Sequence, residues 1–513
     1  MIVGGGLGVR MPAPGPGADG GPGISPLDPV RSAYDPALLQ AMTHIALERL
    51  TGHLPQTRIA GVDLPRPADL VAEADALMRS DAPLAERFGR YVDLHLRTAI
   101  QLPSTGALAR QFTTVLPVAG AVDLVSAIAP QPATFYEAGP LPNAADKLMA
   151  AAFGDRIGWE AGTFGMIATS GGALANLTAI LAARNLHDPR AWHAGLQARG
   201  DGRHRLAVAV GEDAHYSVTR VAGIAGIGED AIVRLPLDAA RRIDVAGARE
   251  ALDRAAADGL EVFCIVAAAG TTPTGAIDPL AALAALARER GAWLHVDGAH
   301  AGAFLVSDAL RPRLAGIELA DSFCLDAHKT LFVPAACTLL FYRDAARADA
   351  AFAQEASYVF DDPAAEMSRF ESGGRNFECT KRPSILPLWV AWSLHGRELF
   401  AAKLDHLVAM TARVAAHLDA LPDFRVIVAP DANILCFEHV PGPRSPLALG
   451  RLQVAIRDRL RAEGRFLISK VDLGDRSVLR LVVMHHEVDL ATIDALVAEI
   501  RRAAIAIEQE AAA

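Results

Sequence analysis

The stretch Ala320-Asp-Ser-Phe-Cys-Leu-Asp-Ala-His-Lys-Thr-Leu-Phe-Val-Pro334 decides the fold of this 513-residue chain. It places Lys329 between two short apolar runs, the setting of a residue that faces a site from a strand end. Upstream, the run Ala-Trp-Leu-His-Val ends in Asp297, a carboxylate where a second buried strand should stop. An amine and a carboxylate so placed predict a binding site at the ends of the strands.

This pair suits pyridoxal 5'-phosphate (PLP) as a cofactor. Lys329 would form a Schiff base with its aldehyde, and Asp297 would hold the pyridinium proton. Taken alone, each residue fits a plainer interpretation, a surface lysine or a strand-end cap. The segments around them favour the cofactor.

Composition indicates a large cytosolic enzyme. At 513 residues the chain exceeds the size of a single core, so we expect two or three packed units. A net charge of −10 without a basic cluster argues against nucleic-acid binding. The five cysteines follow no metal-binding or disulfide spacing, so we expect neither a metal site nor a disulfide framework. No apolar run is long enough to span a membrane or to direct secretion, so we expect a cytoplasmic protein.

The pattern along the chain predicts an α/β protein in four parts. Residues 1–28 are rich in Gly and Pro and resemble a disordered leader, since their glycines do not complete a dinucleotide fingerprint. Residues 29–125 should be a helical segment with little core of its own, which packs on another unit or subunit. Residues 126–395 should form a large domain and 396–513 a smaller α+β domain. Alternating apolar runs and helical stretches predict a mostly parallel, doubly wound sheet, with strands near 164–168, 206–210, 262–267, 293–296, 322–325 and 337–341.

Three further segments fit a ring-binding pocket. The Gly-rich Thr169-Ser-Gly-Gly-Ala-Leu-Ala-Asn176 lies between a strand and a helix, where a helix N-terminus would favour a phosphate. His215 follows a strand at a place where its imidazole could stack on a pyridine ring. Thr272 could hydrogen-bond a cofactor oxygen, and Asp278 is expected to cap the following helix. In isolation, a tight turn is an equally good interpretation of the Gly-rich segment, and a histidine in a turn is more often incidental.

In this order and spacing, the segments resemble the group II PLP-dependent amino-acid decarboxylases. These include the glutamate, cysteine-sulfinate, diaminobutyrate and aromatic-amino-acid decarboxylases. The resemblance covers about residues 36–505 and implies the aspartate-aminotransferase-like fold, fold type I, with a seven-stranded sheet in the large domain. It also implies a homodimer whose active sites lie at the subunit interface. The segments that carry it are 169–176, 215–217, 270–278, 295–302 and 321–334.

The resemblance also implies a role for each matching residue. Lys329 looks like the Schiff-base lysine, Asp297 like the partner of the pyridine nitrogen, and His215 like the stacking histidine. The remaining matches are expected to contact the cofactor: Gly172 and Ala173 as backbone donors to the phosphate, Thr272 and Asp326 as polar contacts, His328 beside the lysine, and Ala299 against the ring. In many relatives asparagine stands at the place of Asp326.

The implied reaction is decarboxylation of an L-amino acid to its amine and CO₂. The segment Glu355-Ala-Ser-Tyr-Val-Phe360 resembles the mobile catalytic loop of the family, so Tyr358 should return the proton to Cα, across the dimer interface. A buried helix aromatic is the alternative for Tyr358. An aldehyde-forming variant is disfavoured because this position is not phenylalanine.

Substrate choice is less clear from the residues. Arg480 resembles the arginine that binds a substrate carboxylate in glutamate-type relatives, although aromatic decarboxylases have one there too. Gln101 lies in a segment similar to the substrate side of these enzymes, shifted by the inserted Pro103. Lys381 or Arg382 would either meet an acidic substrate or form surface ion pairs. A small acidic substrate (glutamate, aspartate or cysteine sulfinate) is favoured. The alternatives are an aromatic or diaminobutyrate decarboxylase, another fold type I enzyme such as an aminotransferase or lyase, and an inactive scaffold.

Overall fold

The computed structural model describes residues 28–54, 64–196, 205–352 and 370–512. They form two compact units, a helical one that ends at Thr98 and a larger α/β one that begins at Ala99. No helix within these ranges is long and apolar enough to cross a membrane. The domain boundaries expected at residues 125 and 395 stay predictions.

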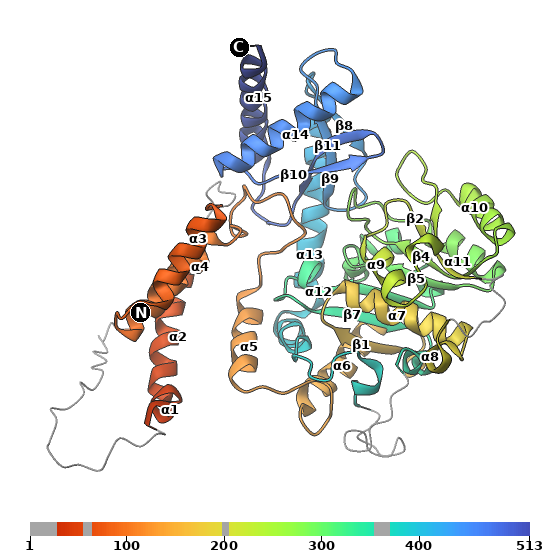
Figure 1. Cartoon of the computed structure of the whole chain (residues 1–513), viewed down its shortest axis with the longest axis horizontal. Coiled ribbons are helices and arrows are strands. Elements are labelled where there is room, and N and C mark those ends of the chain that lie inside the picture. The colour runs from red at the N-terminus through yellow and green to blue at the C-terminus, as the bar shows by residue number, and fades with distance from the viewer. Residues whose placement is uncertain (1–27, 55–63, 197–204, 353–369, 513) are drawn as a thin grey trace. The chain divides into compact units, whose positions relative to one another are not determined.

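The helical unit contains α1 (Asp28–Ala33), α2 (Pro36–His53), α3 (Pro67–Met78) and α4 (Leu84–Thr98) (Figure 1). Proline in the first turn of α2 and α3 fixes φ where no N–H is needed. The Asp35 carboxylate caps α2 by accepting a hydrogen bond from the N–H of Ala37. Gly89 is the only buried residue within α2, α3 and α4, so this unit has almost no core of its own.

The larger unit is built on a seven-stranded sheet of order β1-β7-β6-β5-β4-β2-β3, which confirms the expected architecture. Six strands run parallel to one another, and β7 lies antiparallel between β1 and β6. The carboxyl ends of β1, β6, β5, β4 and β2 therefore meet at one edge. The strands are β1 (Gly165–Thr169), β2 (Arg205–Gly211), β3 (Ile232–Leu235), β4 (Leu260–Ala268), β5 (Trp293–Asp297), β6 (Ser322–Asp326) and β7 (Thr338–Tyr342).

Helices cover the sheet because its strands are almost continuously apolar and buried. Helix α7 (Gly172–His187) packs across β4, β5, β6 and β7, while α10 (Val245–Ala257) and α11 (Leu280–Glu289) pack on β4. The other helices of this part are α5 (Pro117–Ile128), α6 (Pro140–Ile157), α8 (Ala191–Ala194), α9 (Ser217–Ile224) and α12 (Ala327–Thr330). Figure 1 shows α7 lying along the strands, with α9, α10 and α11 grouped beside β2, β4 and β5.

A four-stranded antiparallel sheet of order β10-β11-β9-β8 forms the expected smaller α+β part. The long helix α13 (Ile385–Asp419) leads to it and is broken at Gly396, whose φ of 70° is not helical. The remaining elements are β8 (Phe424–Val428), β9 (Ile434–His439), α14 (Pro446–Glu463), β10 (Ser469–Leu473), β11 (Arg476–Val482) and α15 (Leu490–Ala512).

Candidate functional site

Lys329 and Asp326 form the centre of the site. Asp326 ends β6 and Lys329 lies one turn later on α12, where its Nζ is 2.8 Å from Asp326 Oδ2. The Thr338 hydroxyl donates to the other oxygen of Asp326. Burial acts to lower the pKa of Lys329, but the Asp326 carboxylate and, beyond it, Asp297 together outweigh burial, and the pKa is raised. His328 Nε2 lies 3.6 Å from Asp326 Oδ2, so the predicted His-Lys pair shares one carboxylate.

Asp297 ends the neighbouring strand β5, and its carboxylate is held from two sides. Asn176 Nδ2, on α7, donates to Asp297 Oδ2 at 2.9 Å, and the N–H of Ala299 donates to Oδ1 at 3.1 Å. The Cys324 thiol lies 3.8 Å from Oδ1. Burial raises the pKa of this thiol well above its usual value, so it remains a neutral neighbour. The carboxylate is thus fixed before any ligand binds.

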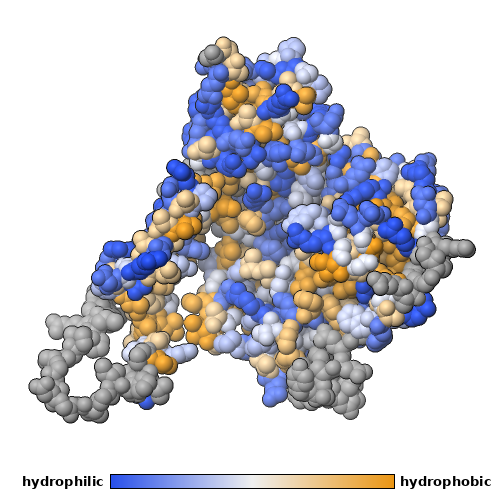
Figure 2. All heavy atoms as spheres, in the orientation of Figure 1, coloured by the Kyte–Doolittle hydropathy of each residue, from blue (hydrophilic) through white to orange (hydrophobic). Residues whose placement is uncertain are grey.

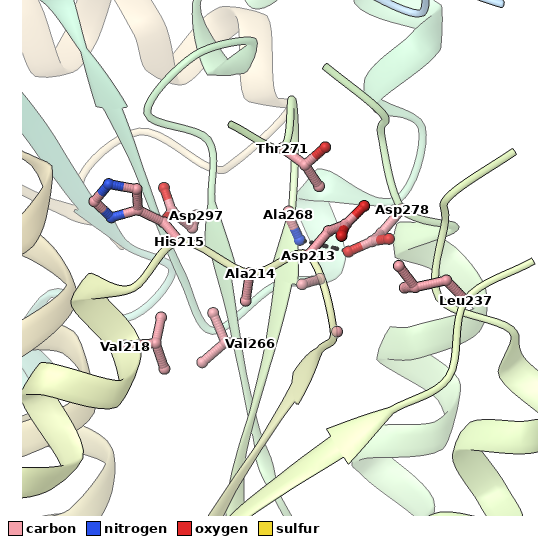
Figure 3. A pocket seen from close by; sticks show the side chains of 12 residues that line it. Asp213, Ala214, His215, Val218, Leu237, Val266, Ala268, Thr271, Asp278 and Asp297 are labelled. Carbon is pink, nitrogen blue, oxygen red and sulfur yellow. Dashed lines mark hydrogen bonds between the residues drawn. The ribbon is translucent and has the colours of Figure 1, made fainter. Parts of the chain in front are cut away.

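His215 lies beside Asp297 at the end of β2, as its expected role requires. Both side chains border a cavity of about 10 Å³, the size of one water molecule (Figure 3). His215 Nδ1 is 2.8 Å from the hydroxyl of Ser217. Burial lowers the pKa of His215, with partial compensation by the Asp297 carboxylate. A neutral imidazole with a fixed orientation can stack on an aromatic ring.

The Gly-rich turn brings the start of α7 against this pair. A Cβ at Gly172 would stand 3.0 Å from Asp326 Oδ1 and 3.4 Å from the Cβ of Ala299, so glycine permits the close approach. The first N–H groups of a helix, here those of Gly172 and Ala173, have no intrahelical acceptor. No other described residue accepts from them. Such groups at a helix start suit a phosphate.

The loop after β4 holds two of the expected residues. Thr271 borders the cavity, and its hydroxyl pairs with that of Thr274 at 2.9 Å. The cofactor contact of Thr272 stays a prediction. Asp278 does not cap α11: it accepts the N–H group of Ala268 at 2.7 Å (Figure 3). It also accepts the N–H group of Ile243 at 2.8 Å. The expectation of a helix cap was wrong, because this buried carboxylate instead hydrogen-bonds the end of β4 and the segment that contains Ile243.

Arg480 is buried, and its guanidinium is already hydrogen-bonded. It donates to the backbone carbonyls of Thr272, Pro273 and Ala109 at 2.8, 3.0 and 3.1 Å. Burial lowers the pKa of Arg480 to about 10. A substrate carboxylate could engage this guanidinium only by sharing or displacing these contacts, so the predicted substrate role of Arg480 stays a prediction.

The other residues proposed for the substrate side are also engaged. Gln101 Nε2 donates to the carbonyl of Ala99 at 2.7 Å. Lys381 is fully buried and donates to the Ala168 carbonyl and the Ser372 hydroxyl, both at 3.1 Å. Arg382 forms an exposed ion pair with Asp123, the plainer of the two interpretations offered for it. Tyr358 lies outside the described residues.

Sequence reasoning gave no role to Asn176, His295 and Ser322, which lie directly behind Asp297. His295 Nε2 is 2.9 Å from Asn176 Oδ1, and His295 Nδ1 is 2.8 Å from the Ser322 hydroxyl. One signal in the sequence pointed to His295: it is two positions from Asp297 in the same strand, so the two side chains share a face.

Comparison with known proteins agrees with this geometry. Residues 114–440 match the family model described as the pyridoxal-dependent decarboxylase conserved domain. The L-2,4-diaminobutyrate decarboxylase of Acinetobacter baumannii is 29% identical over 67% of this chain and 69% of its own length. The L-aspartate decarboxylase of Metarhizium robertsii is 26% identical over 78% of this chain and 79% of its own length.

A solved structure is similar over nearly the whole chain. The crystal structure of mouse CSAD superposes with a TM-score of 0.84 at 24% identity, covering 93% of this chain and 99% of that one. At this identity the likeness shows the fold. The family assignment comes from the match over residues 114–440, which contains the lysine, both aspartates and the Gly-rich turn. The chain therefore belongs to the pyridoxal-dependent decarboxylase family.

Proposed function

We propose that this protein decarboxylates a small acidic L-amino acid, such as aspartate, glutamate or cysteine sulfinate, to the corresponding amine and CO₂. Membership of the family makes it a PLP-dependent carboxy-lyase. The observation that supports PLP chemistry is the placement of Lys329 and Asp297 at one sheet edge, near the start of α7, and the family match supports decarboxylation. The acidic substrate is supported by the aspartate decarboxylase among the relatives.

The residues present fit PLP. Lys329 offers the amine for its aldehyde, and Asp297 a pre-oriented carboxylate for its ring nitrogen. Gly172 and Ala173 offer its phosphate two N–H groups that no other described residue accepts, and a Cβ at Gly172 would crowd this place. When bound, the cofactor supplies an electron-withdrawing ring that stabilises the negative charge left on Cα by loss of CO₂.

In this proposal each residue has a separate task. Asp297 would hold a proton at the ring nitrogen and so keep the ring electron-withdrawing. His215 would stack against the ring. Lys329 would hold the cofactor through its aldehyde until a substrate amine takes its place. Tyr358 is assigned, from the family resemblance alone, to donate the proton that replaces CO₂ on Cα.

We further propose a cytoplasmic homodimer with shared active sites. An apolar hollow of about 600 Å³ lies among α2, α3 and α4, and Val71 and Met78 nearby are each 69% exposed. Figure 2 shows hydrophobic residues interspersed with hydrophilic ones along these helices. Exposed apolar surface of this kind marks an interaction site. All five cysteines are free, as in proteins of a reducing compartment.

A substrate screen tests the proposal. The purified protein with bound PLP is supplied with each amino acid, and release of CO₂ and amine is measured. Aspartate, glutamate or cysteine sulfinate should be turned over faster than asparagine, glutamine, diaminobutyrate or aromatic amino acids by orders of magnitude. Faster turnover of diaminobutyrate or an aromatic amino acid would refute the acidic class alone. Lys329→Ala should bind no borohydride-reducible cofactor, and CO₂ release by that variant would refute the site.

A further inference from the structure

A continuous line of buried polar groups runs into the Asp297 carboxylate. Trp293 Nε1 donates to the Ser322 hydroxyl at 2.8 Å, and this hydroxyl is 2.8 Å from His295 Nδ1. His295 Nε2 is 2.9 Å from Asn176 Oδ1, and Asn176 Nδ2 donates to Asp297 Oδ2 at 2.9 Å. We call these four residues before the aspartate the donor chain. Trp293, His295 and Asp297 alternate along β5 and therefore share the face covered by α7.

The chemistry of its two ends fixes the direction of every hydrogen bond in the donor chain. An indole N–H can only donate, and a carboxylate can only accept. Because Ser322 accepts from Trp293, its own hydrogen is free to point at His295 Nδ1. Asn176 presents its amide NH₂ to the carboxylate, so its oxygen faces His295 and accepts from Nε2. The neutral His295 ring thus carries its hydrogen on Nε2.

Burial keeps His295 neutral at ordinary pH. The ring is fully buried, and burial lowers its pKa to about 4, with partial compensation by the Asp297 carboxylate. A second hydrogen on Nδ1 would oblige the Ser322 hydroxyl to turn its own hydrogen away. The donor chain therefore keeps one arrangement of hydrogens over the whole neutral range.

We propose that Trp293, Ser322, His295 and Asn176 are positioning residues, whose one-way hydrogen bonds hold the Asp297 carboxylate in the orientation that receives the ring nitrogen of PLP. The inference rests on the proposed role of Asp297. Buried polar side chains are costly unless all of them are paired. Here every member pairs with the next. Since hydrogen bonds in a low-dielectric interior polarise one another, loss of a distant member is felt at the carboxylate.

The test distinguishes the contribution of the ring nitrogen to cofactor binding from that of the rest of the cofactor. Apoprotein is titrated with PLP and with its carbocyclic analogue, in which CH replaces the ring nitrogen. Ser322→Ala should weaken PLP binding about 3- to 10-fold, the factor for one net hydrogen bond, and leave analogue binding unchanged. Ser322→Thr keeps the hydroxyl and should restore the wild-type ratio of the two affinities. Ser307→Ala is the matched control, because it also removes a fully buried, hydrogen-bonded hydroxyl but lies outside the donor chain.

The outcomes are distinguishable. A Ser322→Ala protein with the wild-type affinity ratio overturns the inference, as does the same change of ratio in Ser307→Ala. If both the wild type and Asp297→Asn bind PLP and the analogue with equal affinity, the proposed role of Asp297 is refuted. That result is distinct from a failure of the donor chain alone.

A second measurement needs no folded variant of Ser322. In the ¹⁵N-histidine-labelled wild type, His295 should show a protonated Nε2 and an unprotonated Nδ1, with no titration between pH 8 and pH 6. Its signal is assigned by its loss in His295→Gln. A hydrogen on Nδ1, or titration near the usual histidine range, would contradict the donor chain.

Discussion

The Asp326 carboxylate controls the charge on Lys329 at the scale of single residues. Burial alone would lower the pKa of Lys329, and the neighbouring carboxylates, Asp326 first among them, reverse this effect. In Asp326→Asn the charge is lost, so the lysine pKa should fall and more of the reactive neutral amine should exist at neutral pH. A lost hydrogen bond to a charged group corresponds to about 1.5–3 kcal/mol. Capture of PLP by the apoprotein at pH 7 should therefore become about 10-fold faster or more.

Stopped-flow absorbance over a range of pH measures this capture. The pH at which the rate of PLP capture begins to rise should be lower in Asp326→Asn than in the wild type. Thr338→Val serves as the control, because it removes only the hydroxyl that donates to Asp326 and keeps the charge. An unmoved profile in Asp326→Asn would show that the carboxylate does not set the lysine charge.

Asp278 makes stability depend on pH. Burial raises its pKa from 3.8 to about 6, although two backbone N–H groups oppose the shift. The folded state therefore binds more protons than the unfolded state between these values, and stability falls as pH rises through the folded pKa. From pH 5 to pH 7.5 the expected loss from this residue is about 1.4 kcal/mol.

Asp278→Asn removes the titration. Free energies of unfolding of the apoprotein at pH 5 and pH 7.5 should show that the wild type loses its advantage over the variant at the higher pH. A constant difference between the two proteins at both pH values would mean that Asp278 is ionised throughout.

The segment 372–382 holds the end of β1 at the scale of elements. Lys381 donates to the carbonyl of Ala168, just before the Gly-rich turn, and lies 4.0 Å from the buried Asp146. Burial lowers the pKa of Lys381 and raises that of Asp146. Either charge would therefore destabilise the fold if its partner were removed. Lys381→Met should destabilise the apoprotein by about 3–5 kcal/mol, because it leaves a buried partner alone.

A double-mutant cycle with Asp146→Leu checks this coupling, read from denaturant unfolding. The double variant should lose less stability than the sum of the single variants. Arg382→Met is the neighbouring control, since its exposed pair with Asp123 should contribute at most about 1 kcal/mol. Equal losses in Lys381→Met and Arg382→Met would refute the buried anchor.

The long apolar strands and the main site residues could be predicted, while short strands and side-chain partners could not. Strands β5 and β6 are buried on both faces and read as apolar runs that end in carboxylates. Strand β3 has four residues at a sheet edge and β10 has a mostly half-buried pattern, so neither gave an apolar signal. The engagement of Arg480 with carbonyls of two distant segments depends on tertiary packing. Neither the residue type of Arg480 nor its position in the chain indicates those partners.

At the scale of the whole molecule, one sheet edge gathers residues from five strands into the site. Parallel strands place their carboxyl ends together, so residues separated by more than a hundred positions, such as Asn176 and Asp297, are in contact. The helical unit contributes no comparable core, and its apolar side chains remain exposed within it. A free energy gain is available if another surface covers them.

A second copy of the chain is the proposed cover, and solution mass tests it. The wild type should have about twice the chain mass of 54.0 kDa in light scattering. Val71 and Met78 are seven positions apart on α3 and share a face. Each buried apolar side chain is worth about 1.5–3 kcal/mol, so Val71→Asp with Met78→Asp should shift the protein toward monomer. Ile505→Asp on α15, where the side chain is 57% exposed, should leave the mass unchanged. A monomeric wild type, or a double variant as dimeric as the control, would exclude these helices as the dimer interface.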